Sequence, residues 1–157
     1  MQNFVNVFGN SIRSHDAFYA PVGDGKISFV DVRDVAAVAV KVLIDDQYYR
    51  HNCKAYNITG SDVFSYGEAA EILSNEVGKK ISYVNITQDD ARKGMKDIGM
   101  DDWFINSLIE LYAIERTGYL SSISSEFEEL TGKKPISFSH FAKDYADSFK
   151  SEIVIKK

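Results

Sequence analysis

The sequence has one cysteine, two prolines and no long apolar run, and each shortage excludes a class of protein. Cys53 has no second thiol to pair with, so a disulfide scaffold is excluded and a reducing, cytoplasmic compartment is expected. No stretch reaches the roughly 18 consecutive apolar residues that a membrane-spanning helix needs. The first residues also lack the basic start and apolar centre of a signal peptide. We therefore expect no membrane partner.

Basic residues are also too few for a nucleic-acid-binding protein. The 157 residues include 18 Lys and Arg against 23 Asp and Glu, which gives a formal net charge of −5. Non-specific binding to nucleic acid needs a basic face that displaces counterions from phosphates, so no nucleic-acid partner is expected. The 45% hydrophobic and 26% charged residues are typical of a globular protein, and we expect residues 1–157 to form one compact unit.

Helical periodicity alternates with short apolar segments, which predicts an α/β unit with more helix than strand. Capping residues indicate where helices begin: Asp31, Ser65, Thr87, Asp101 or Asp102, Ser125 and Ser137. Strands are expected at 17–22, 27–30, 55–59 and 81–86, with a frayed end or an edge strand at 153–155. The apolar stripe from Met1 to Ile12 has no capping residue, so the chain is expected to open inside a helix of a longer protein.

Four groups of short segments follow one another along nearly the whole chain. They are GDGKISFVDVRDVA (23–36), YNITG (56–60) with FSYGEAA (64–70), GKKISYV (78–84), and LTGKKP (130–135) with Phe138 and Phe141. The ordered set resembles the later half of NmrA-like proteins, which are atypical short-chain dehydrogenase/reductases. These are also described as NAD(P)-binding, NAD(P)H:quinone oxidoreductase-like or nucleoside-diphosphate-sugar epimerase-like. The resemblance implies the helix-rich C-terminal, substrate-side part of a Rossmann-like NAD(P)-binding fold, with a few short strands.

The sequence departs from that family in its glycines. Family members begin with a glycine-rich turn that lets the backbone approach the cofactor pyrophosphate at a helix N-terminus. None of the ten glycines here forms a GxGxxG or GxxGxxG pattern. The nearest candidate is Gly23-Asp-Gly25, but Ser28 takes the place of the third glycine and a strand is expected next. We expect no N-terminal dinucleotide-binding domain and no cofactor-binding residue in this chain.

Catalytic residues and metal ligands are not evident either. Typical short-chain reductases use a Tyr-x-x-x-Lys pair, in which the lysine lowers the tyrosine pKa. None of the nine tyrosines has a lysine four residues later, and Tyr112, which has Arg116, is interpreted as helix packing. His51 and Cys53 supply at most two of the three or four ligands that a metal site needs, so no metal is expected.

Two sets of side chains are candidates for a site. The first is a polar cluster of Asp31, Arg33 and Asp34, which either lines a substrate cleft or caps a helix and complements its dipole. The second either forms a pocket for a small aromatic or carbonyl ligand or belongs to the core. It comprises Asn3, Phe4, Phe8, Tyr19, Phe29 and Trp103.

The resemblance implies NAD(P) as the cofactor of full-length members, and the missing glycine turn implies that this chain alone binds none. We expect the substrate-binding or interaction portion of an oxidoreductase or epimerase-like protein, without turnover of its own. Two alternatives stay open: part of an active quinone or carbonyl reductase once a Rossmann half completes it, and an NAD(P)-sensing regulator without chemistry. A homodimer is expected, because the strands would lie at the open edge of a truncated sheet.

Overall fold

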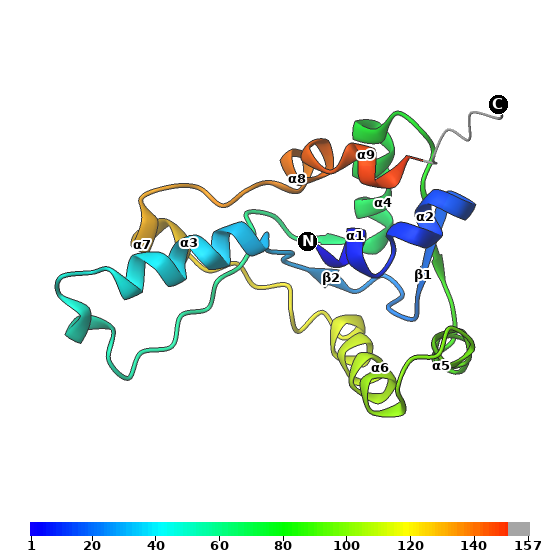
Figure 1. The fold of residues 1–157 in the computed structure, drawn as a ribbon, viewed down its shortest axis with the longest axis horizontal. Coiled ribbons are helices and arrows are strands. Elements are labelled where there is room, and N and C mark those ends of the chain that lie inside the picture. Colours follow the sequence, from blue (N-terminus) through cyan, green and yellow to red (C-terminus); the bar gives the residue numbers. More distant parts are fainter. Residues whose placement is uncertain (151–157) are drawn as a thin grey trace.

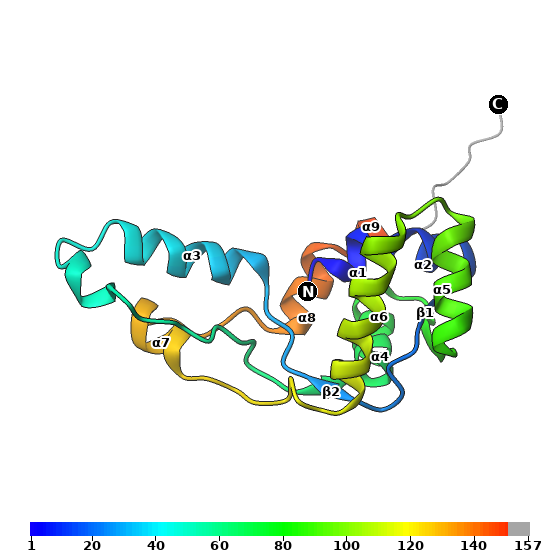
Figure 2. The same cartoon turned by 90° about the horizontal axis from the view of Figure 1, so that it is seen from below.

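The computed structural model describes residues 1–150, which form a main body and a long arm (Figures 1 and 2). The arm contains α3 (Val32–Leu43), the short 3-10 helix η1 (Tyr48–His51) and α7 (Glu126–Thr131). The main body contains α1 (Asn3–Asn6), α2 (Gly9–His15), β1 (Ala17–Ala20), β2 (Lys26–Ile27), β3 (Phe64–Ser65), α4 (Tyr66–Val77), β4 (Ser82–Asn85), α5 (Gln88–Asp97), α6 (Asp102–Arg116), α8 (Phe138–Asp144) and α9 (Ala146–Phe149).

The strands form two small sheets, so the α/β class with few short strands is confirmed. β1 pairs with β4 in parallel, with Ala17 opposite Ser82 and Ala20 opposite Asn85. β2 pairs with β3 in the antiparallel sense, with Ile27 opposite Phe64. Because β1 and β4 run in the same direction, their carboxyl ends meet at one edge of the main body.

The expectation of strands at 17–22 and 81–86 is confirmed by β1 and β4, but the other two strand predictions need correction. Only Ile27 of the segment 27–30 belongs to a strand, and 55–59 forms none. Side chains connect this segment to residues 124–126 instead: Asn57 N donates to the Glu126 carboxylate, and the Thr59 hydroxyl accepts from Ser124 N at 3.0 Å. A strand needs a neighbouring strand, and this segment has none within residues 1–150. The segment 153–155 lies outside the described residues.

Local capping signals place the helix starts correctly. The side chains of Asp31, Ser65, Thr87, Asp101 and Ser137 each accept a backbone N–H at the start of a helix. At Ser65 the capping box is complete, because Glu68 accepts the Ser65 N–H at 2.7 Å while its own N–H donates to Ser65 Oγ. Ser125 lies at the start of α7 without a side-chain cap. The opening helix is split into α1 and α2 near Gly9, a residue that disfavours helix interiors.

The core of the main body is built around aromatic rings. Phe4 lies at its centre and is 1% exposed. Its ring centroid is 5.0–5.9 Å from those of Phe8, Phe18, Phe29, Tyr66 and Phe138. This cluster joins the N-terminal segment to β1, α4 and α8, so these parts of the main body share one apolar core.

The arm leaves an apolar surface uncovered. Figure 2 shows α7 on one side of α3 and no described element on the opposite side. Several apolar side chains of α3 and the residue that follows it are exposed: Val32, Val35, Val40, Leu43 and Ile44. We call this surface the α3 face. Isolated exposed apolar residues are ordinary, but a row of them along one helix indicates a contact surface.

Candidate functional site

An apolar pocket of about 370 Å³ lies where β1 and β4 end. Tyr19 comes from the end of β1, Ile86 directly follows β4, and Phe8 precedes α2. The remaining wall comes from α5, the turn after it, and α6, through Ala91, Gly94, Met95, Ile98, Met100 and Tyr112. Ligands of open parallel sheets bind outside the carboxyl ends of the strands, so this pocket has the expected position for a ligand site.

The apolar pocket offers contact area rather than acid–base chemistry. Its lining residues with polar groups are Ser11, Asp90 and the two tyrosines, Tyr19 and Tyr112. Burial, with a smaller contribution from the nearby Glu115, raises the pKa of Tyr112 to about 12, so its hydroxyl stays neutral and can donate a hydrogen bond. Flat apolar ligands with one hydrogen-bond acceptor fit this combination of thioether, aliphatic and aromatic groups.

A second cavity of about 190 Å³ lies next to the first, and Phe8 lines both. We call it the Glu115 pocket, because the buried residue Glu115 lines it together with Tyr66. Tyr66 Oη donates to Glu115 Oε2 at 3.2 Å. Burial raises the pKa of Glu115 to about 7 even though this hydrogen bond opposes the change. Burial and then the Glu115 charge raise the pKa of Tyr66 well above its usual value.

The predicted aromatic set divides between these two cavities. Phe8 and Tyr19 line the apolar pocket, whereas Asn3, Phe4, Phe8 and Phe29 line the Glu115 pocket. Trp103 lines neither of them and is 74% exposed at the start of α6. The structure therefore brings together five of the six predicted residues around two adjoining cavities and leaves Trp103 apart.

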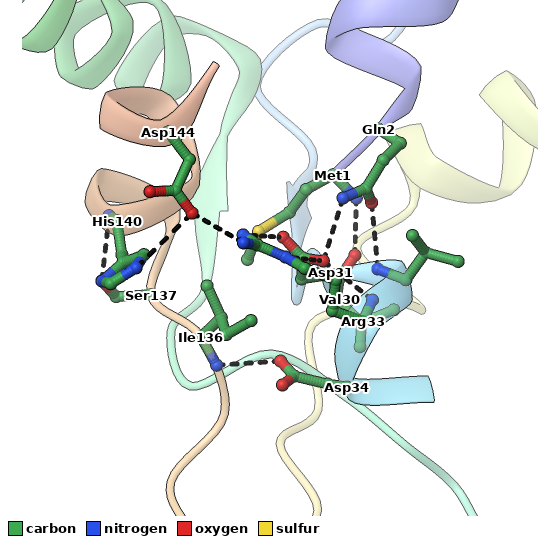
Figure 3. A network of polar contacts seen from close by, with 11 residues as sticks. Met1, Gln2, Val30, Asp31, Arg33, Asp34, Ile136, Ser137, His140 and Asp144 are labelled. Carbon is green, nitrogen blue, oxygen red and sulfur yellow. Dashed lines mark hydrogen bonds and ion pairs between the residues drawn. The ribbon is translucent and has the colours of Figure 1, made fainter. Parts of the chain in front are cut away.

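The predicted polar cluster forms a junction between the arm and the main body, as Figure 3 shows. Asp31 is fully buried; its Oδ1 accepts from Arg33 N at 2.8 Å and from Gln2 Nε2 at 2.9 Å. Arg33 Nη2 pairs with Asp31 Oδ2 at 2.9 Å, and Arg33 Nη1 pairs with Oδ2 of Asp144, on α8, at 2.7 Å. None of the predicted cluster lines either cavity. These contacts give the cluster a capping and positioning role.

Burial and hydrogen bonds at the junction shift the pKa values of Asp31 and Asp34 in opposite directions. Burial alone would raise the pKa of Asp31, but the hydrogen bonds from Arg33 and Gln2 outweigh it and lower that pKa. Asp34 accepts a hydrogen bond from Ile136 N at 2.8 Å, yet burial dominates and raises the pKa of Asp34. Asp31 is therefore held ionised by its donors, and the junction is stabilised by charge.

Sequence reasoning missed Glu115, although the sequence contains a signal for it. Residues Ile105, Ile109, Tyr112 and Glu115 are the buried positions of α6, with helical spacings of four, three and three. A carboxylate at the end of such a stripe is anomalous, because glutamate is rarely fully buried unless it is paired. The helical period alone would have placed Glu115 among the apolar residues.

The Gly23-Asp-Gly25 turn packs against α6. A Cβ at Gly25 would lie 2.2 Å from the carbonyl oxygen of Glu115, so glycine is required for this close approach. Gly23 N donates to Asn85 Oδ1 at 2.9 Å.

Within residues 1–150, no group of three or more His, Cys, Asp or Glu side chains could hold a metal ion. Over the same residues, no helix is long and apolar enough to cross a membrane.

No protein-family model matches the chain, but individual proteins do. An NAD(P)H azoreductase of Xenophilus azovorans is 36% identical over 149 residues, which are 95% of this chain and 51% of that protein. An uncharacterized oxidoreductase of Bacillus subtilis is 31% identical over 93% of this chain and 50% of its own length. The chain is related to these oxidoreductases. It spans about half the length of each of them.

Solved structures agree on the fold. The NADPH-dependent quinone oxidoreductase of Escherichia coli superposes with a TM-score of 0.79 at 23% identity, covering 91% of this chain and 50% of the other. A triphenylmethane reductase of Citrobacter gives a TM-score of 0.78 at 22% identity, over 94% of this chain and 50% of that one. At this level of identity the likeness establishes the fold alone, and the chain shares that fold with about half of each of these two reductases.

Proposed function

We propose that this chain is the C-terminal, substrate-side portion of an NmrA-like NAD(P)H-dependent oxidoreductase, and that it has no turnover alone. One observation carries the proposal: the chain matches an NAD(P)H azoreductase over 95% of its own length but only 51% of that protein's. The chain also has no glycine pattern that could hold a pyrophosphate. Cofactor binding would then come from a second, nucleotide-binding half. For the compartment we propose the cytoplasm, which the lone Cys53 supports because it has no second thiol to pair with.

The apolar pocket is the proposed substrate site. It lies at the carboxyl ends of parallel strands, and its volume of about 370 Å³ is within the range of small-molecule sites. Phe8, Tyr19 and Met95 offer an apolar surface to a flat ring. The neutral hydroxyl of Tyr112 can donate to a carbonyl, quinone or azo group. A small aromatic or carbonyl compound is therefore the proposed ligand class.

The α3 face is proposed as the surface that a nucleotide-binding half covers. Leu43 is 81% exposed and Val40 is 54% exposed, although both are apolar residues of a well-formed helix. The segment 55–59 beside the arm has apolar strand-like residues but no strand partner among residues 1–150. In the absence of the other half, we propose that two copies of the chain associate through the α3 face as a homodimer.

Ligand titrations test the cofactor and substrate proposals separately. Calorimetry with NADPH and NADH should show no micromolar binding to the isolated chain, and such binding by a single copy would refute the proposal.

Fluorescence titration with 4-hydroxyazobenzene should show that this compound binds to the isolated chain. Gly94 lines the apolar pocket and has open space at its Cβ position, so Gly94→Phe should fill the pocket and weaken that binding, while Gly94→Ala should not. Equal binding to both variants would contradict the assignment of the pocket.

Sedimentation tests the α3 face. We expect the isolated chain to be dimeric at tens of micromolar, and Val40→Asp to make it monomeric. Tyr119→Asp is the matched control, because Tyr119 is 80% exposed but lies after α6, away from the α3 face. A monomeric wild-type chain, a dimer that survives Val40→Asp, or a dimer that Tyr119→Asp breaks equally would refute this interface.

A further inference from the structure

Glu115 is a buried acid without a cationic partner. Glu115 is 7% exposed. Within residues 1–150 its side chain makes one hydrogen bond, which Tyr66 donates. No ion pair of the described residues includes Glu115. It also lies next to the last residue of α6, where the helix dipole opposes a negative charge. An ionised carboxylate in such surroundings is costly unless a positive group arrives to pair with it.

The cavity beside Glu115 is suited to a positive group. Four aromatic residues line it, namely Phe4, Phe8, Phe29 and Tyr66. Aromatic ring faces attract ammonium and guanidinium groups, most strongly where water is excluded. No lysine or arginine is among the residues that line the cavity, so no cationic side chain of the described chain fills this role.

We propose that the Glu115 pocket is a second binding site, separate from the apolar pocket, for a small organic ligand that carries a protonated amine or quaternary ammonium group. The cationic nitrogen pairs with the Glu115 carboxylate, and the carbon atoms attached to it contact the aromatic rings. The volume of about 190 Å³ limits the ligand to a short alkyl or single-ring amine. This proposal goes beyond the oxidoreductase function and does not depend on it.

The neighbouring titratable groups determine the pH dependence of such binding. Tyr66 on α4 and Tyr112 on α6 both have pKa values raised by burial, so they stay neutral up to pH 9. Met1 is also among the residues that line the cavity, and burial lowers the pKa of its amino group to about 6. It donates to Val30 O at 2.5 Å. Because the raised pKa of Glu115, about 7, leaves it mostly protonated at pH 6, an ammonium ligand should bind best above pH 7.

Calorimetry with n-butylammonium chloride tests the proposal, with 1-butanol as the neutral probe. The buffer is phosphate, because Tris is itself an amine. We expect butylammonium to bind about tenfold more tightly at pH 8 than at pH 6, as the ionised fraction of Glu115 rises. Glu115→Gln should remove the preference for butylammonium over butanol and most of its pH dependence. Glu110→Gln, an exposed acid on the same helix, should behave as wild type.

Two results would overturn the proposal. One is equal affinity of wild type and Glu115→Gln for butylammonium at pH 8, including the case in which neither binds. The other is read directly on the wild-type chain by carbon NMR of the Glu115 carboxyl group. Butylammonium should lower the pKa of this group, and an unchanged titration midpoint at saturating probe would refute the site even if the glutamine variant does not fold.

Discussion

Replacing Glu115 by glutamine should stabilise the protein, and the gain should depend on pH. Burial raises the pKa of Glu115 from its usual 4.5 to about 7, so the folded state favours the protonated acid. The stability that this group contributes is therefore fully present below pH 4.5 and is lost as the pH rises through 7. Glutamine is the neutral isostere, and its carbonyl oxygen can still accept the hydrogen bond from Tyr66.

The expected size follows from the difference in pKa. At about 1.4 kcal/mol per pKa unit, ionising Glu115 costs about 3 kcal/mol of unfolding free energy above pH 8. At pH 5 the cost is below about 1 kcal/mol, because most of the group is still protonated in the folded state. Glu115→Gln should therefore be more stable than wild type by up to about 3 kcal/mol at pH 8 and by much less at pH 5.

Urea unfolding of both proteins at pH 5 and pH 8 measures this difference. The Met1 amino group also titrates in this range, but it is present in both proteins and its effect cancels in the comparison. Glu110→Gln is the control for the loss of one negative charge on α6, and it should change stability little at either pH. The reasoning is refuted if Glu115→Gln is no more stable than wild type at pH 8, or if its gain is the same at both pH values.

Three further substitutions test the packing and the junction by urea or thermal unfolding. Asp31→Ala should cost about 1–2 kcal/mol at pH 7, because it removes a helix cap and the buried partner of Arg33. This loss should shrink as the pH falls below the usual aspartate range, because the hydrogen bonds to Asp31 lower the pKa at which its carboxylate protonates. Gly60→Ala should destabilise strongly, since its Cβ would lie 1.9 Å from the carbonyl oxygen of Phe29. Gly94→Ala should instead stabilise α5 by up to about 1 kcal/mol, because its Cβ meets open space. Equal effects of the two alanine substitutions would contradict the predicted close contact.

Features that depend on neighbouring residues could be predicted from the sequence. Ser65 and Glu68 form the expected capping box because all its partners lie within four residues. The α/β class followed from the same kind of local signal. Strand formation at 55–59 could not be judged in this way, because a strand forms only where another strand supplies hydrogen bonds. That partner is not specified by the apolar residues of the segment itself.

The candidate site was predictable in part. Phe8 and Tyr19 were expected near a ligand, and they line the apolar pocket. Their neighbours Met95 and Tyr112 come from helices whose position depends on tertiary packing, so periodicity alone did not reveal them. Trp103 was grouped with the others by residue type, but its position on α6 directs it to solvent. Residue type predicts burial more reliably than it predicts which cavity a side chain faces.

The junction between arm and main body has a consequence for the order of folding. Arg33 pairs with Asp144, which follows 111 residues later, and Asp34 accepts its hydrogen bond from Ile136, 102 residues later. While the chain is being synthesised, α3 therefore emerges long before the groups that fix its direction. Closing such long loops is slow. The orientation of the arm is thus among the last features to form. Until then Val38, the apolar residue of α3 that the folded protein buries, is open to chaperones and to other nascent chains along with the α3 face.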